Sequence, residues 1–167
     1  MVAAGVIIVA TVGLLATVKT ASDPGNTTKE AFDLPQLGGG GRVRLADFKG
    51  QPTVVNFFAS WCSACDFELP GFAKLSNELK GRVRFVGVDA LETGDPMYMP
   101  RRHGLTWWPL AHDVGGSNGS GLHDSLGGGN SMPITAFYNA NGKLVHLGLG
   151  ALPESSLRAK LHELYGV

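Results

Sequence analysis

The sequence has only two cysteines among 167 residues, at positions 62 and 65. Two are too few for a disulfide-rich scaffold or for a zinc site made of four thiolates. The chain also lacks an excess of charge, because 14 Lys and Arg balance 14 Asp and Glu, so no overall field attracts nucleic acid. Glycine is abundant at 24 residues but follows no G-X-Y period. Any chemistry is expected to centre on one pair of sulfur atoms.

Several other kinds of site lack their usual residues. The five histidines stand at positions 103, 112, 123, 146 and 162, with no pair three or four residues apart and none close in sequence to the cysteines. The glycine-rich stretches do not end in the Gly-Lys-Ser/Thr string of a phosphate-binding loop. We therefore expect no nucleotide and no resident metal. A copper or zinc site made of Cys62, Cys65 and a distant histidine is the alternative.

The N-terminal segment is apolar. Residues 1–18 carry no charged side chain, and as a helix they would reach about 27 Å, slightly less than the roughly 30 Å core of a bilayer. A cleaved signal peptide is an alternative, but a cut after Ala21 would leave Lys19 where a small residue is preferred. A buried core helix is a third interpretation. We expect an uncleaved transmembrane signal anchor at 1–18, a polar linker at 19–30 and one domain at 31–167.

The strongest secondary-structure signals surround the cysteines. The run T-V-V-N-F-F-A at 53–59 is apolar, β-branched and aromatic, which predicts a central strand buried on both faces. Between 62 and 79, apolar residues recur at helical spacing and predict a helix that contains Pro70. The run at 83–89 predicts a second buried strand. A β-helix-β order of this length makes the two strands parallel.

The rest of the chain supplies shorter elements. They are an edge strand over 42–45, a helix around 98–103, a strand within 107–113, a helix over 122–126, strands over 134–138 and 143–149, and a closing helix over 153–165. The Asn-Ala-Asn-Gly string at 139–142 joins the last two strands as an antiparallel hairpin. This order predicts an α/β fold in which a mixed central sheet has helices on both faces.

The two cysteines lie where a buried strand turns into a helix. At a spacing of three residues their side chains share one helix face, close enough for a disulfide. The N-terminus of a helix favours a thiolate at Cys62, because unpaired N–H groups and the positive end of the dipole lie there. We therefore expect Cys62 to be the nucleophile. Cys65 lies one turn further in and is expected to resolve the mixed disulfide that Cys62 forms.

Two stretches of sequence resemble a known family. They are F-F-A-S-W-C-S-A-C at 57–65 with the E-L-P that follows at 68–70, and M-P-I-T-A-F at 132–137. Together they resemble the thioredoxin superfamily, and within it the membrane-anchored TlpA, ResA and DsbE group of bacterial thiol-disulfide oxidoreductases. The resemblance covers about residues 31–167 and implies a thioredoxin-like fold.

The resemblance also implies roles for individual residues. Pro133 would be cis and face the cysteine pair, and the backbone of Met132 would pair with an extended substrate segment. Glu68 would lie near the buried thiol and exchange its proton, with a solvated helix carboxylate as the alternative. Trp61 would shield the disulfide and form a partner surface, or else belong to the core. Asn56 stands where thioredoxin carries a buried Asp, so proton handling would pass to Glu68 or to water.

The function expected from this resemblance is redox chemistry in exported proteins. The protein would be a single-pass protein of the cell membrane with an extracytoplasmic domain, or secreted or periplasmic if the leader is cleaved. It would reduce disulfides in exported proteins such as apocytochrome c during cytochrome c maturation. Electrons would come from a membrane thiol donor, and no cofactor beyond the cysteine pair is expected. A disulfide-forming oxidase is the close alternative, and a copper-binding or interaction module on the same fold is an alternative of another class.

Overall fold

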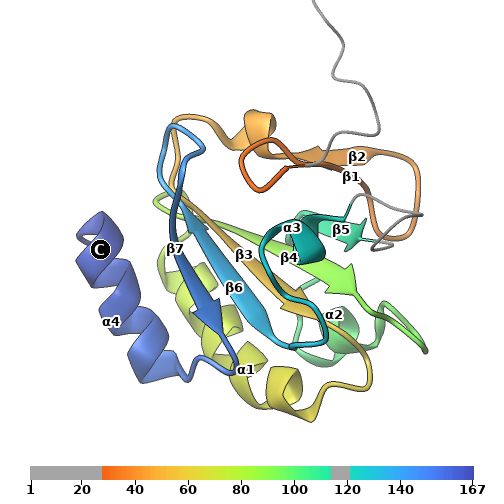
Figure 1. The fold of residues 1–167 in the computed structure, drawn as a ribbon. Coiled ribbons are helices and arrows are strands. Elements are labelled where there is room, and N and C mark those ends of the chain that lie inside the picture. Colours follow the sequence, from red (N-terminus) through yellow and green to blue (C-terminus); the bar gives the residue numbers. More distant parts are fainter. Residues whose placement is uncertain (1–27, 114–120) are drawn as a thin grey trace, which may run out of the picture.

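A mixed five-stranded sheet lies at the centre of the computed structural model, which describes residues 28–113 and 121–167 (Figure 1). Its strands are β3 (Thr53–Phe58), β4 (Arg84–Ala90), β5 (Leu110–Asp113), β6 (Ile134–Tyr138) and β7 (Leu144–Leu149). They are ordered β5-β4-β3-β6-β7. The neighbours β3, β4 and β5 are parallel, whereas β6 is antiparallel to both β3 and β7. The predicted mixed sheet, its parallel crossover and its antiparallel hairpin are confirmed.

The strand that leads into the cysteines is the middle strand of the sheet. All six residues of β3 are buried, and the flanking strands β4 and β6 satisfy its backbone on both sides. Its side chains alternate between two apolar clusters, so that Val54 and Phe58 lie in one while Val55 and Phe57 lie in the other. The continuous apolar run is therefore explained by burial on both faces.

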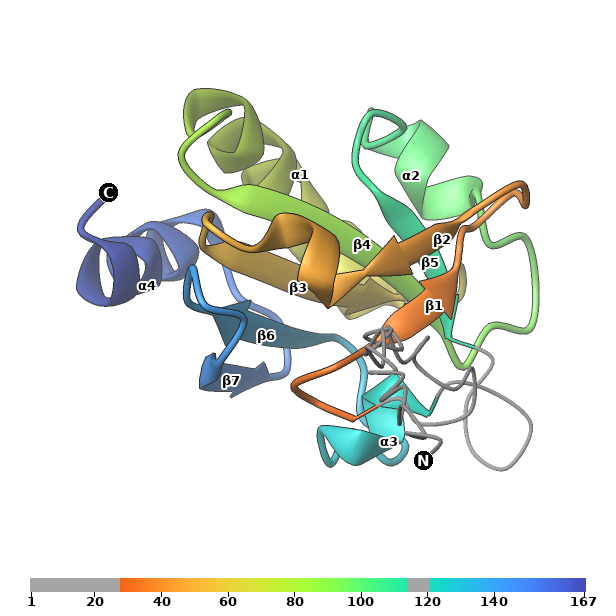
Figure 2. The same cartoon turned by 90° about the horizontal axis from the view of Figure 1, so that it is seen from above.

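Helices cover both faces of the sheet, but unequally (Figure 2). One face packs against α1 (Ser63–Glu78), α2 (Tyr98–Arg102) and α4 (Glu154–Tyr165). The other face is covered by the one-turn helix α3 (Leu122–Ser125), the 3-10 helix η1 (Leu45–Phe48) and a small sheet. The α1 helix runs through Pro70, and at Gly71 it touches α4 so closely that a Cβ there would lie 2.8 Å from Cβ of Glu154.

The expected edge strand over 42–45 does not belong to the main sheet. Strand β2 (Arg42–Arg44) instead pairs antiparallel with β1 (Asp33–Pro35), which was not predicted, in a separate two-stranded sheet. This small sheet lies beside β5, where the backbone N–H of Leu37 donates to the carbonyl of Leu110 at 2.9 Å. Burial of Leu34 and Val43 beneath it explains why such short strands hold their place.

The expected anchor at 1–18 and most of the linker at 19–30 lie outside the described residues. Within residues 28–113 and 121–167, no helix has the length and apolar composition needed to cross a bilayer.

Candidate active site

The cysteine pair lies at the junction of β3 and α1, as the sequence predicts. Cys62 is the N-cap of α1, and its Sγ accepts the backbone N–H of Cys65 at 3.0 Å. The two sulfur atoms are joined in a disulfide with Cα atoms 5.2 Å apart. Both residues are buried in the apolar cluster between the sheet and α1. A backbone N–H of the first helical turn therefore points toward the sulfur of Cys62, where it would stabilise a thiolate.

Glu68 is buried on α1 one turn after Cys65, so the solvated alternative is wrong. It follows Cys65 by three residues on α1, and only 1% of its surface is exposed. Its two carboxylate oxygens accept from Asn56 Nδ2 at 2.7 Å and from the backbone N–H of Leu152 at 2.6 Å. Burial raises its pKa from 4.5 to about 7, against the opposing effect of these two hydrogen bonds. A carboxyl group with this pKa can take up and release a proton near neutral pH.

Asn56 connects Glu68 to the strand that follows Pro133. Its side chain is fully buried in β3 and also donates to Thr135 Oγ1 of β6 at 3.3 Å. An Asp here would place a second carboxylate against Glu68, whereas the amide supplies a donor. Asn56 therefore holds the Glu68 carboxyl in place without adding a second titratable group beside it.

Trp61 and the Met132-Pro133 pair flank the disulfide from two separate segments. Half of the Trp61 surface is exposed, so a purely core position is wrong, and its Nε1 donates to the Leu91 carbonyl at 2.8 Å. The Met132–Pro133 peptide bond is cis, as the resemblance implies. Pairing of Phe57 in β3 with Ile134 in β6 brings this bond to the end of the sheet where α1 begins. Met132 packs against the cluster that contains both cysteines.

In the described part of the chain, the residues on either side of Met132 form hydrogen bonds through their carbonyl groups, whereas the backbone of Met132 forms none. The Pro133 carbonyl accepts from the N–H of Gly150 at 2.9 Å, and the Ser131 carbonyl accepts from Nε2 of His123 at 2.9 Å. Within the described residues, the backbone N–H and carbonyl of Met132 form no hydrogen bond. An extended segment of another chain could pair with Met132 by adding a strand.

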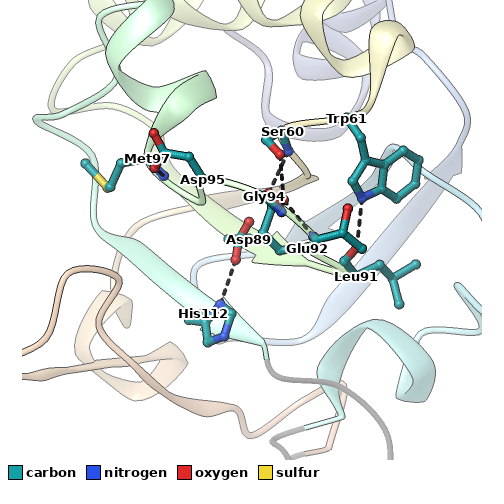
Figure 3. Close-up of polar contacts among 10 residues, drawn as sticks. Ser60, Trp61, Asp89, Leu91, Glu92, Gly94, Asp95, Met97 and His112 are labelled. Carbon is teal, nitrogen blue, oxygen red and sulfur yellow. Dashed lines mark hydrogen bonds and ion pairs between the residues drawn. The ribbon is translucent and has the colours of Figure 1, made fainter.

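Sequence reasoning missed a second group of polar residues next to the pair (Figure 3). Glu92 follows β4 and accepts both the backbone N–H and the hydroxyl of Ser60, two residues before Cys62, at 2.6 and 2.5 Å. Behind it, the buried carboxyl of Asp89 contacts Nδ1 of His112 at 2.6 Å. The available signal was Asp89 near the end of the buried run that became β4 and His112 near the end of the run that became β5. Their proximity depends on the strand pairing.

His123 is a further residue that the sequence did not single out. It is buried at the start of α3, packs edge-on against Phe57, and holds Ser131 one residue before Met132. The close approach of its ring to Gly128 leaves no room for a Cβ there. His123 thus fixes the approach of the chain to the cis-Pro133 segment.

Comparison with known proteins then identifies the family. Residues 24–146 match the AhpC/TSA family. The chain belongs to the AhpC/TSA family. The match begins before β1 and ends within β7, so it includes the cysteine pair, Glu68 and the cis-Pro133 segment.

Several relatives of this AhpC/TSA family chain are named as thiol-disulfide oxidoreductases. The thiol-disulfide oxidoreductase ResA of Oceanobacillus iheyensis is 30% identical over 125 residues, which are 73% of this chain and 62% of that protein. ResA of Geobacillus thermodenitrificans is 29% identical over 154 residues, 89% of this chain and 82% of that protein. Among solved structures, the pneumococcal exposed lipoprotein thioredoxin Etrx1 of Streptococcus pneumoniae has a TM-score of 0.63 and 28% identity. The matched region makes up 80% of this chain and 99% of the Etrx1 chain.

These matches confirm the thioredoxin-like fold and the resemblance to ResA-type proteins. They also confirm, at the level of the family, the expected class of enzyme, a thiol-disulfide oxidoreductase. Among the described residues, no group of three or more His, Cys, Asp or Glu side chains is arranged to hold a metal ion.

Proposed function

We propose that the protein is an extracytoplasmic thiol-disulfide oxidoreductase that reduces disulfides in exported proteins, apocytochrome c among them. The observation that carries the proposal is the Cys62–Cys65 disulfide at the N-terminus of α1, together with a Met132 backbone that forms no hydrogen bond within residues 28–113 and 121–167. The names of the ResA relatives support the reaction class, and the likeness to Etrx1, an exposed lipoprotein, supports the location.

The reaction starts from the reduced pair. The Cys62 thiolate attacks a substrate disulfide, which breaks the substrate S–S bond and forms a mixed disulfide. Cys65 gives its proton to Glu68 and attacks the sulfur of Cys62, so that the second substrate thiol leaves. Two electrons have then passed from the pair to the substrate, and the product is the disulfide seen in the structure. A membrane thiol donor would reduce the pair again.

The docking roles follow from the positions of three residues. The exposed ring of Trp61 offers an apolar surface beside the disulfide, and Met132 offers backbone groups to an extended substrate segment. Pro133 is buried and has no N–H, so it presents no donor where that segment approaches. Residues 1–18 would anchor the domain to the membrane through the linker at 19–30.

A disulfide-forming oxidase is the second candidate. A strong oxidant stabilises its thiolate more than its disulfide, and a nearby cation is one way to do so. In the described part of the chain, the hydrogen bond that reaches the sulfur of Cys62 comes from a backbone N–H, and no cationic side chain bonds to it. This setting favours a potential on the reducing side.

Insulin reduction tests the reaction class. Cys62→Ser is expected to abolish reduction of insulin disulfides, and Cys65→Ser to accumulate a mixed disulfide, while Ser63→Ala, at the exposed position between them, keeps the activity. Reduction of insulin by the Cys62→Ser variant would overturn the proposal.

The reduction potential of the Cys62–Cys65 pair separates the candidates. A potential near −270 mV would support a reductase, whereas one near −120 mV would assign the oxidase. A tight copper complex of the reduced wild type that Cys62→Ser loses, together with no insulin reduction, would assign the binding module.

A further inference from the structure

The turn that precedes Cys62 is held by one carboxylate. Glu92 accepts the backbone N–H of Ser60 at 2.6 Å and its hydroxyl at 2.5 Å (Figure 3). Glu92 also accepts the backbone N–H groups of Thr93 and Gly94 at 2.7 and 2.6 Å. Four donors therefore converge on its two oxygens, an arrangement that suits an ionised carboxylate. Glu92 ties the loop after β4 to the residue that lies two positions before the nucleophile.

A backbone conformation that is rare for leucine directs this loop toward the turn. Leu91 has a φ of 54°, in the left-handed region that side chains with a Cβ seldom adopt. Its carbonyl accepts from Nε1 of Trp61 at 2.8 Å, while the next residue, Glu92, reaches Ser60. The loop thus holds both residues that lie immediately before Cys62.

Asp89 lies behind Glu92 and is completely buried. Its Oδ2 contacts Nδ1 of His112 at 2.6 Å, and its carboxyl interacts with that of Glu92. Among the described residues, no N–H or O–H donor reaches Asp89 Oδ1. Two carboxyl groups can form a hydrogen bond only when one of them carries a proton. Because Glu92 already accepts from four donors, the proton belongs on Asp89.

We propose that Asp89 is a positioning residue of the active-site turn. In its protonated form it donates to Glu92 and so keeps that carboxylate against Ser60, while His112 fixes the other oxygen of Asp89. When Asp89 loses this proton, two adjacent carboxylates repel each other, and the hold of Glu92 on the turn weakens. The inference rests on the proposed function in that the turn is the one that carries Cys62.

The electrostatic surroundings agree with this assignment. Burial, followed by the hydrogen bond and the charge of Glu92, raises the pKa of Asp89 from 3.8 to about 8. Burial alone would also raise the pKa of Glu92, but the bonds from Ser60 and the loop amides outweigh it and lower that pKa to about 2. Among the described residues, the titratable groups that face Asp89 are Glu92, from the loop after its own strand, and His112, from β5. Phe58, which pairs with Asp89 from β3, does not titrate.

Trp61 provides a reporter for this network in the disulfide form, in which no thiol titrates. We expect its fluorescence to change in one step as the pH rises through about 8, because loosening of the loop alters its bond to the Leu91 carbonyl. The same titration of Trp61→Phe gives the contribution of the other two tryptophans. Asp89→Asn, whose amide donates to Glu92 and accepts from His112 without titrating, should lose the step and keep the low-pH emission at every pH.

Two further variants complete the test. Asp95→Asn, at an exposed position of the same loop, is the matched control and should keep the wild-type step. Glu92→Gln replaces one accepting oxygen by a donor and should shift the Trp61 emission at every pH. A step that persists in Asp89→Asn, or its absence from the wild type, would overturn the proposal. Since the titration uses oxidised protein and no substrate, failure of the insulin assay would refute the proposed function and leave this result intact.

Discussion

The buried carboxyl of Glu68 makes the free energy of unfolding depend on pH in a direction fixed by its surroundings. Its pKa is raised from 4.5 to about 7 in the folded protein, so the native state binds this proton more tightly than the unfolded state does. The contribution of Glu68 to stability therefore falls as the pH rises from 4.5 to about 7 and does not change further above that range. The difference between these two pKa values corresponds to about 3 kcal/mol.

Glu68→Gln removes this titration and keeps the size of the side chain. Urea unfolding of the disulfide form would be followed for both proteins from below pH 4.5 to above 7, and the two free energies subtracted at each pH. The wild type should lose about 3 kcal/mol relative to the variant across this range. Other titrating groups, including Asp89, cancel in the difference. Glu78→Gln, on the exposed side of the same helix, controls for removal of one helical carboxylate. A difference that stays flat, or that rises with pH, would refute the burial argument.

The same variant tests Glu68 as the acceptor of the Cys65 proton. Loss of a general base typically slows the step it serves by about 100-fold or more. In Glu68→Gln we expect the resolution of a mixed disulfide at Cys62 to slow by about this factor in rapid-mixing experiments, while formation of that mixed disulfide keeps its rate. Equal slowing of both steps would instead indicate a general distortion of the site.

Two glycine positions give further predictions. In Gly128→Ala the new Cβ overlaps the ring of His123, so urea unfolding should show a loss of about 1–3 kcal/mol, and reduction of protein disulfides should fall more than reduction of a small disulfide. Equal losses on both substrates would argue against a docking role for the segment that His123 holds. In Gly71→Ala the Cβ meets Glu154 at 2.8 Å and separates α1 from α4, which should cost a similar amount. Unchanged stability would show that the two helices can move apart freely.

Most of the fold could be predicted because local sequence patterns specify its main helices and strands. The run at 53–59, the helical spacing after Cys62 and the turn residues at 139–142 each specify an element without reference to the rest of the chain. The small sheet was missed for the opposite reason. Strand β1 has three residues, and its place depends on burial of Leu34 and on contacts with β5 that no local pattern records.

The part of the candidate site that lies on one continuous segment could be predicted from the sequence. The contacts between residues from distant segments could not. The roles proposed for Cys62 and Cys65 follow from their place at a strand-to-helix turn, whereas the state of Glu68 depends on Leu152, whose backbone N–H donates to it from a distant part of the chain. Asp89 and His112 face each other only because β4 and β5 pair in a register that sets these two residues side by side. Spacing in the sequence contains no information about that register.

The antiparallel pairing of β3 with β6 has a consequence for how the protein becomes functional. The two thiols are three residues apart in the chain and can meet through local turns alone, but the Met132–Pro133 segment comes to the end of the sheet where α1 begins only when Phe57 lies opposite Ile134. A nascent or partly unfolded chain would therefore carry reactive cysteines without the docking segment that we propose for the substrate. Competence to act on proteins, as distinct from reactivity toward small thiols, is thus a measure of completed folding. Comparing the two during refolding would follow the formation of this strand pair.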